Sequence, residues 1–113
     1  MHELSICGSI ADIVVRRARE RRVETIHLRI GQLRQVVPDT LTYCWQLVSS
    51  GSELDGSVLD VETVRARISC QDCGQTSELG DLPTFVCASC HGVSVSVVAG
   101  EEFMITALDV AGV

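Results

Sequence analysis

The chain has 113 residues, of which 46% are hydrophobic and 21% charged, a composition typical of a globular domain and not of a disordered segment. Fifteen acidic residues against nine arginines and no lysine give a net charge of −6, which argues against binding nucleic acids or anionic membranes through a general basic field. The sequence lacks a run of about 18 apolar residues and the pattern of a secretory signal. We therefore expect a cytoplasmic protein with reduced cysteines and no membrane partner.

The first predicted element is a helix over residues 3–22. Its apolar residues recur at steps of three and four and so share one face: Leu4, Cys7, Ala11, Val14 and Ala18. Five arginines crowd its last turns, where positive charge complements the helix dipole: Arg16, Arg17, Arg19, Arg21 and Arg22. We expect a solvated helix end, with docking of an acidic partner as the alternative.

A strand and a second helix follow. Ile26, Leu28 and Ile30 alternate with polar residues, which predicts a half-buried strand that ends at Gly31. Pro38 then ends an extended stretch, and Asp39 is expected to cap the second helix. The predicted apolar face of this helix and the glycine that follows its end are Leu41, Cys44, Trp45, Val48 and Gly51.

The remaining strands are less regular. Val58–Ile68 is predicted to be one long strand, and its apolar residues change parity, so we expect a bulge near Thr63. Val93, Val95 and Val97 alternate with serines in a strand that Gly100 interrupts. Phe103–Val110 is apolar on both parities, which is typical of a central strand.

Four of the six cysteines form two pairs that predict a metal site. The pairs Cys70-Gln71-Asp72-Cys73 and Cys87-Ala88-Ser89-Cys90 are thirteen residues apart, and two such turns direct four sulfurs at one centre. Zinc accepts four thiolates, which leave no position for a catalytic water, so we expect a structural Zn²⁺ site. A rubredoxin-like iron site would use the same thiolates, although only Phe85 offers an aromatic shell, and a redox dithiol would need one pair alone. His91 is expected to lie at the surface. The alternatives are that its imidazole replaces one sulfur as a ligand or donates a hydrogen bond to a sulfur.

The other two cysteines, Cys7 and Cys44, are expected to be buried, inert thiols on helix faces.

The first three residues, Met1-His2-Glu3, offer a second kind of metal chelate. The terminal amine, the His2 backbone nitrogen and the His2 imidazole can close small rings on one ion, and Glu3 adds a backbone nitrogen or a carboxylate. Such a nitrogen and oxygen set suits Ni²⁺ or Cu²⁺. An ordinary frayed terminus is the alternative.

These pieces, in this order, resemble the HypA/HybF family of hydrogenase maturation proteins over nearly the whole chain. The matching motifs include Ile30-Gly31-Gln32-Leu33, Val37-Pro38-Asp39-Thr40-Leu41 and Cys87-Ala88-Ser89-Cys90-His91. The resemblance implies a nickel metallochaperone that delivers Ni²⁺ to the large subunit of [NiFe]-hydrogenase. It also implies work with an accessory GTPase and, in some organisms, with urease accessory proteins. His2 and Glu3 are the implied nickel ligands, with Asp39 as a further candidate.

We therefore predict an α+β fold in which two helices pack on a small three-stranded sheet made by Ile26–Ile30, Leu59–Ile68 and Phe103–Val110. A zinc-ribbon-like four-cysteine module is inserted between the second and third strands. In domain terms, residues 1–68 plus 99–113 form a nickel-binding α/β domain and residues 69–98 an inserted zinc-binding domain, in a monomer or homodimer.

Two other classes of function fit the sequence less well. A zinc-ribbon nucleic-acid or protein-interaction module is the main alternative, but the sequence pI is about 4.9 and almost no basic or aromatic side chain lies between the cysteines. We expect no enzyme and no nucleic-acid partner, because the sequence has no catalytic triad, phosphate loop or GTPase motif.

Overall fold

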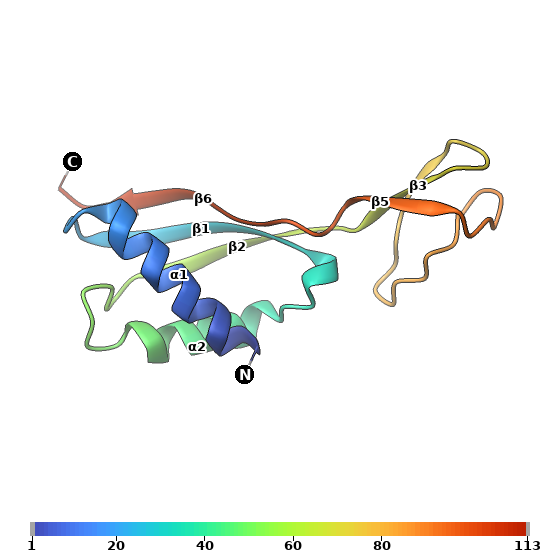
Figure 1. Ribbon diagram of the computed structural model, residues 1–113. Coiled ribbons are helices and arrows are strands. Elements are labelled where there is room, and N and C mark those ends of the chain that lie inside the picture. Colours follow the sequence, from blue (N-terminus) through green and yellow to red (C-terminus); the bar gives the residue numbers. More distant parts are fainter. Residues whose placement is uncertain (1, 113) are drawn as a thin grey trace. The chain divides into compact units, whose positions relative to one another are not determined.

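The structure is a computed structural model that describes residues 2–112 (Figure 1). Its elements in chain order are α1 (His2–Ala18), β1 (Val23–Gly31), the short 3-10 helix η1 (Gln32–Arg34), α2 (Pro38–Ser49), β2 (Val58–Val64), β3 (Arg67–Cys70), β4 (Thr76–Glu78), β5 (Val95–Ala99) and β6 (Phe103–Val110). The strands form two three-stranded sheets, ordered β2-β1-β6 and β4-β3-β5. The predicted α+β class is confirmed, and β3, β4 and β5 form the inserted module between β2 and β6.

The contacts divide the chain into two compact units. Unit 1 comprises Met1–Arg29, Val36–Glu62 and Met104–Val113, and unit 2 comprises Ile30–Gln35 and Thr63–Phe103. Unit 1 thus contains both helices and most of the first sheet. Unit 2 contains the second sheet and the four paired cysteines. The functional division into a nickel-binding and a zinc-binding domain stays a prediction.

The core of unit 1 follows from the apolar faces of its elements. Helices α1 and α2 pack against each other, and alternation along β1 directs one row of its side chains to the interior. The most completely buried residues are Cys7, Ile10, Val14, Ile26, Leu28, Leu41 and Trp45. Trp45 Nε1 donates to Ser57 Oγ at 3.0 Å, and Ser57 Oγ donates to the carbonyl of Leu54 at 2.6 Å, so the connection after α2 is anchored to the core.

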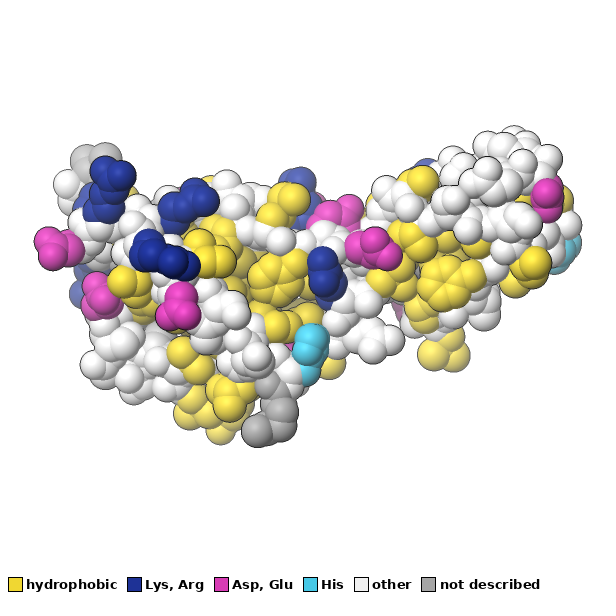
Figure 2. Space-filling model, in the orientation of Figure 1, with side chains coloured by type: hydrophobic (Ala, Val, Ile, Leu, Met, Phe, Trp, Pro, Cys, Tyr) yellow, Lys and Arg dark blue, Asp and Glu magenta, His cyan; other side chains and the backbone are white. Residues whose placement is uncertain are grey.

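The prediction that the first helix continues to Arg22 is wrong, because α1 ends at Ala18. Arg19 and Glu20 have φ angles of 51° and 70°, in the left-handed region that ends a helix, and Arg21 N donates to the carbonyl of Ala18 at 3.1 Å. Basic side chains gather around this end of α1 (Figure 2). Docking of an acidic partner at these arginines stays a prediction.

Helix α2 begins where the sequence predicts, although its cap is different. Val37 occupies the N-cap position without a side-chain bond, Pro38 is the first helical residue, and Asp39 therefore lies inside the first turn. At the other end, Gly51 follows the C-cap Ser50 with φ +75°, as predicted.

Two strand predictions are wrong. Val58–Ile68 is not one strand: β2 ends at Val64 and β3 begins at Arg67 in the other sheet. The change of parity therefore marks the passage from one sheet to the next and not a bulge near Thr63. Phe103–Val110 is not central either, because β1 lies between β2 and β6 and leaves β6 at the edge.

Unit 2 has a small core. The antiparallel register pairs Ile68 with Ser77 of β4 and with Val97 of β5. Its buried apolar cluster consists of Ala66, Ile68 and Leu79, with Leu33, Val95 and Val97 packed against it. Within residues 2–112, no helix is long and apolar enough to cross a membrane.

Candidate metal centres

The four paired cysteines converge on one point. Their Sγ atoms all lie within 4.8 Å of one another. Cys70 Sγ lies 3.6 Å from Cys90 Sγ, and Cys73 Sγ lies 3.6 Å from Cys87 Sγ. A disulfide would bring two sulfurs to about 2.05 Å, and these cysteines are free. Four Zn–S bonds of ~2.3 Å in a tetrahedron separate the sulfurs by ~3.8 Å, so the observed spacing fits a tetrahedral ion.

Two tight turns produce this arrangement. In the first, Gly74 N donates to the carbonyl of Cys70 at 2.9 Å, and Gly74 has a φ of +77°. In the second, His91 N donates to the carbonyl of Cys87 at 3.0 Å. Gly92 is needed for space, because a Cβ there would lie 2.8 Å from Asp72 Oδ2 and 3.2 Å from Cys90 Sγ. Gly74 is therefore favoured by its backbone conformation and Gly92 by lack of space.

Backbone donors in the second turn favour the thiolate form of Cys87, the form that a metal requires. Cys87 Sγ accepts backbone N–H bonds from Cys90 at 3.5 Å and from Ser89 at 3.4 Å. These two bonds lower the pKa of the Cys87 thiol to about 6. The four thiols therefore fit zinc in geometry and in the type of donor. His91 is exposed and does not belong to the group of four.

The other two cysteines lie in unit 1. Cys7 is 0% exposed, and its Sγ lies 3.5 Å from the carbonyl oxygen of Leu41. Burial raises the pKa of the Cys7 thiol to about 11, so the thiol is protonated at neutral pH. Cys44 is half-buried. The buried, inert thiol predicted on the face of α1 is present at Cys7.

The residues expected to bind nickel lie where the starts of the two helices meet. His2 is the first residue of α1, and Glu3 Oε2 accepts the backbone N–H of Val37 at 3.1 Å. This bond is the main reason that the pKa of Glu3 is below its ordinary value. Val37 is the N-cap of α2 and Asp39 lies in its first turn, so Glu3 and Asp39 belong to one region.

This region is not a closed ligand cage. Within residues 2–112, the four cysteines are the only group of three or more His, Cys, Asp or Glu residues with ligand atoms close enough to share an ion. His2 and Asp39 are both exposed. The amine of Met1, which belongs to the predicted chelate, lies outside the described residues. Sequence patterns gave no sign of the contact between Glu3 and Val37, because it joins positions 34 residues apart.

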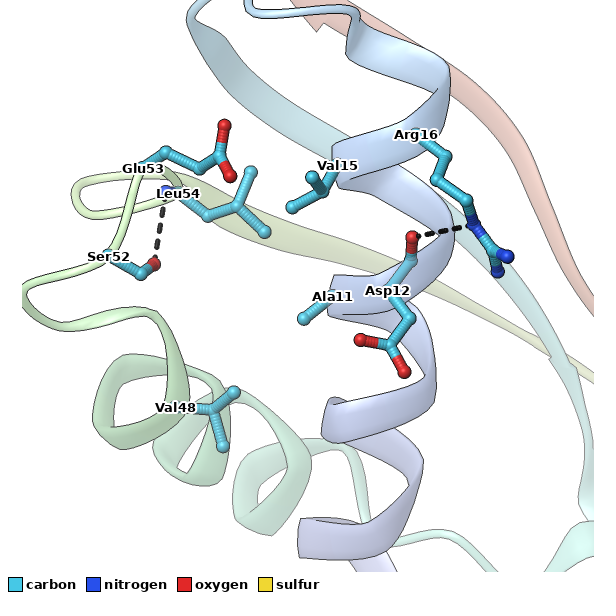
Figure 3. Close-up of a pocket in the computed structure, with 8 residues that line it drawn as sticks. All are labelled: Ala11, Asp12, Val15, Arg16, Val48, Ser52, Glu53 and Leu54. Carbon is cyan, nitrogen blue, oxygen red and sulfur yellow. Dashed lines mark hydrogen bonds between the residues drawn. The ribbon is translucent and has the colours of Figure 1, made fainter.

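A surface hollow between α1 and the connection after α2 does not contribute to either centre. It measures about 400 Å³, and its apolar lining consists of Ala11, Val15, Val48 and Leu54 (Figure 3). The side chain of Arg16, on α1, bonds back to the carbonyl of Asp12 at 3.2 Å. None of the predicted metal ligands lines this hollow.

Comparison with known proteins places the chain in a family. A family described as "Hydrogenase/urease nickel incorporation, metallochaperone, hypA" matches residues 1–110. The hydrogenase maturation factor HypA of Geotalea uraniireducens is 37% identical over 110 residues, which cover 97% of this chain and 99% of that protein. The HypA of a Roseiflexus species is 35% identical over 112 residues, covering 96% of this chain and 91% of that protein.

A solved structure agrees in fold. The solution structure of the Ni metallochaperone HypA from Helicobacter pylori matches with a TM-score of 0.66 and 21% identity, covering 97% of both chains. At this identity the likeness speaks for the fold alone. The sequence matches speak for the family, which is one of metallochaperones and not of enzymes. The chain belongs to the HypA family of nickel metallochaperones for hydrogenase maturation.

Proposed function

We propose that this chain binds Ni²⁺ at its amino terminus through His2 and Glu3, with Asp39 as a further ligand, and passes the ion to the large subunit of [NiFe]-hydrogenase. The supporting observation is the 3.1 Å bond between Glu3 Oε2 and Val37 N. It fixes the first turn of α1 beside the start of α2, and so brings two of the three ligand candidates into one region.

The chemistry of this region suits a carrier. Imidazole nitrogen and carboxylate oxygen are donors that Ni²⁺ accepts, and neither is a soft thiolate that would retain it. The bond to Val37 occupies one of the roughly four acceptor sites of the Glu3 carboxylate and orients the group without blocking it. Because His2 and Asp39 are exposed, an ion held here remains accessible to a receiving protein.

The thiolate centre has a different role in this proposal. Cys70, Cys73, Cys87 and Cys90 would hold Zn²⁺ and fill its coordination, leaving no position for nickel or water. The bound zinc would cross-link unit 2, whose buried apolar cluster contains only three residues. We assign it a structural role.

The proposed partners follow from what the chain lacks and from its family. The sequence has no phosphate-binding loop, so nucleotide energy would come from the accessory GTPase, and urease accessory proteins are a second set of candidates. A nucleic-acid-binding zinc ribbon is disfavoured because residues 71–89 contain three acidic residues and no arginine or lysine. A cytoplasmic location is part of this proposal, because thiols stay reduced in the cytoplasm and can bind zinc there.

Titration of the zinc-loaded protein with Ni²⁺, followed by calorimetry and metal analysis, tests the proposal. His2→Ala is expected to abolish high-affinity nickel binding while the zinc content stays the same. His91→Ala is the matched control, since it removes another exposed histidine and is expected to leave nickel binding intact. Nickel affinity and stoichiometry unchanged in His2→Ala would show that the amino-terminal assignment is wrong.

Asp39 needs its own comparison. Asp39→Asn is expected to weaken nickel binding, because it removes one carboxylate donor while keeping the side-chain volume. Glu53→Gln removes an exposed carboxylate from the connection after α2 and is expected to have no effect. Equal nickel affinities in these two variants would remove Asp39 from the ligand set and leave His2 and Glu3 in place.

A further inference from the structure

A histidine in the middle of the first sheet bridges both neighbouring strands. His27 lies on β1, and its Nδ1 is 2.9 Å from Asp60 Oδ2 on β2. Its Nε2 is 2.9 Å from Asp109 Oδ2 on β6. The imidazole is 30% exposed and lies on the opposite parity from the buried residues Ile26 and Leu28. All three groups belong to unit 1, and none is among the proposed metal ligands.

The protonation state of this imidazole decides how many of its contacts are attractive. A neutral ring has one N–H donor and one bare nitrogen, whereas the charged ring donates from both nitrogens. With a carboxylate oxygen at hydrogen-bond distance from each nitrogen, a neutral ring would direct one lone pair at an anion. Only the imidazolium satisfies Asp60 and Asp109 together, and both bonds are then charge-assisted.

We propose that His27 is a proton-dependent bridge that ties both outer strands of the sheet to β1, and that loss of its proton releases one of the two strands from this anchoring. The charged or titratable residues of the three strands are Glu24, His27 and Arg29 in β1, Asp60 and Glu62 in β2, and Asp109 in β6. Asp60 and Asp109 favour the charged ring, whereas the cation Arg29 opposes it. Arg29 Nε pairs with Glu62 Oε2 at 3.5 Å, which leaves the other two carboxylates to His27.

The direction of the pH effect follows from these contacts. The bonds to Asp109 and to Asp60 raise the pKa of His27 above its ordinary value. The folded protein then binds a proton more tightly than the unfolded chain does. The bridge is fully present below the ordinary imidazole pKa of about 6.5, and its contribution is lost as pH rises through the raised pKa. If the pKa of His27 differs by one between the folded and the unfolded chain, the folding equilibrium changes about tenfold.

The first test is an NMR titration of the imidazole nitrogens of His27 in the zinc-loaded protein. The titration midpoint is expected above about 6.5, and Asp60→Asn and Asp109→Asn should each lower it. Glu62→Gln is the matched control, because it removes a carboxylate of the neighbouring strand that does not contact His27. It should lower the titration midpoint of His27 less than the other two variants do. A midpoint at or below that of a free imidazole would overturn the proposal, as would equal shifts in all three variants.

The second test asks whether the proton matters for the strands. Amide exchange in β2 and β6 is compared at pH 6 and pH 8.5 after correction for intrinsic rates. Protection in one of the two strands is expected to fall about tenfold for each unit by which the midpoint is raised. In His27→Gln, whose amide does not titrate, this fall should be absent. The same pH dependence in His27→Gln would assign the effect to other groups and refute the bridge.

Discussion

Replacement of Gly31 by alanine is expected to destabilise the protein, because backbone fills the space in which a side chain would stand. Gly31 has φ −75° and ψ 148°, angles that any residue adopts without strain. A Cβ at this position would overlap the carbonyl carbon and oxygen of Gly100 and lie 2.6 Å from Glu101 N. The requirement for glycine is therefore one of space and not of conformation.

The contacts at this position give the expected loss of stability in Gly31→Ala. Gly31 N donates to the carbonyl of Glu102 at 2.7 Å, and Leu33 N donates to the carbonyl of Gly100 at 2.8 Å. Separating the two segments would cost these two bonds, at about 1 kcal/mol each, plus roughly 1–3 kcal/mol for overpacking. Alanine returns up to about 1 kcal/mol by restricting the unfolded chain. The net loss is about 2–5 kcal/mol, a large part of the stability of an ordinary domain.

Urea unfolding of the zinc-loaded protein, followed by circular dichroism, measures this loss. Gly8→Ala is the control, since a Cβ at this helical position meets nothing within 4 Å. It should stabilise the protein by roughly 0.5–1 kcal/mol, because alanine is the better helix former. The reasoning is refuted if Gly31→Ala lies within about 0.5 kcal/mol of the wild type, the range expected of an unconstrained surface position.

Two further predictions concern the core and the zinc site. Ser57→Ala leaves the buried Nε1–H of Trp45 without its acceptor and should lower the free energy of unfolding in urea by about 1–3 kcal/mol. Ser5→Ala, at an exposed position of α1, is the control and should change this free energy little. Removal of zinc by a chelator should abolish amide-exchange protection in residues 70–92 and leave the helical signal of α1 and α2 in place. Protection that persists in the metal-free protein would contradict the structural role of zinc.

Local patterns were sufficient to predict most elements, because each depends on residues close together in sequence. The alternation of Ile26, Leu28 and Ile30 predicts β1, and all three are buried. The two Cys-x-x-Cys turns predict the four-thiol cluster, because each turn is local and directs two sulfurs at one centre. Only the approach of one turn to the other depends on tertiary structure.

The predictions that failed depend on tertiary structure. The arginine-rich segment after Ala18 favours continuation of the helix. Arg19 and Glu20 have left-handed backbone conformations, which their residue types do not predict. Along Val58–Ile68, a bulge and a passage between two sheets produce the same change of parity. Only the pairing of β3 with β4 and β5 distinguishes them.

Contacts between residues far apart in the sequence could not be predicted from the sequence either. The parity of β1 places His27 on the outer face, but the sequence does not give the register that brings Asp60 and Asp109 to its two nitrogens. The bond from Val37 to Glu3 is of the same kind. The donor atoms of the first three residues predict a chelate for Ni²⁺ or Cu²⁺, and resemblance to a family singles out nickel. The structure adds the contact that relates Glu3 to the start of α2.

The placement of the cysteines bears on how a carrier can hold nickel and still release it. Cys7 is the cysteine nearest to the amino terminus in sequence, and a thiolate there would bind Ni²⁺ more firmly than a carboxylate does. Its side chain is instead fully buried against α2, and its pKa of about 11 keeps the thiol protonated. The sulfurs of the four paired cysteines lie within 4.8 Å of one another, where a single zinc ion would saturate them. Burial of Cys7 and saturation of the four paired thiols would remove five of the six cysteines from competition for nickel, and the sixth, Cys44, is half-buried on α2. Under the proposed assignment, His2, Glu3 and Asp39 would then hold the ion through nitrogen and oxygen donors, from which it can pass to a partner.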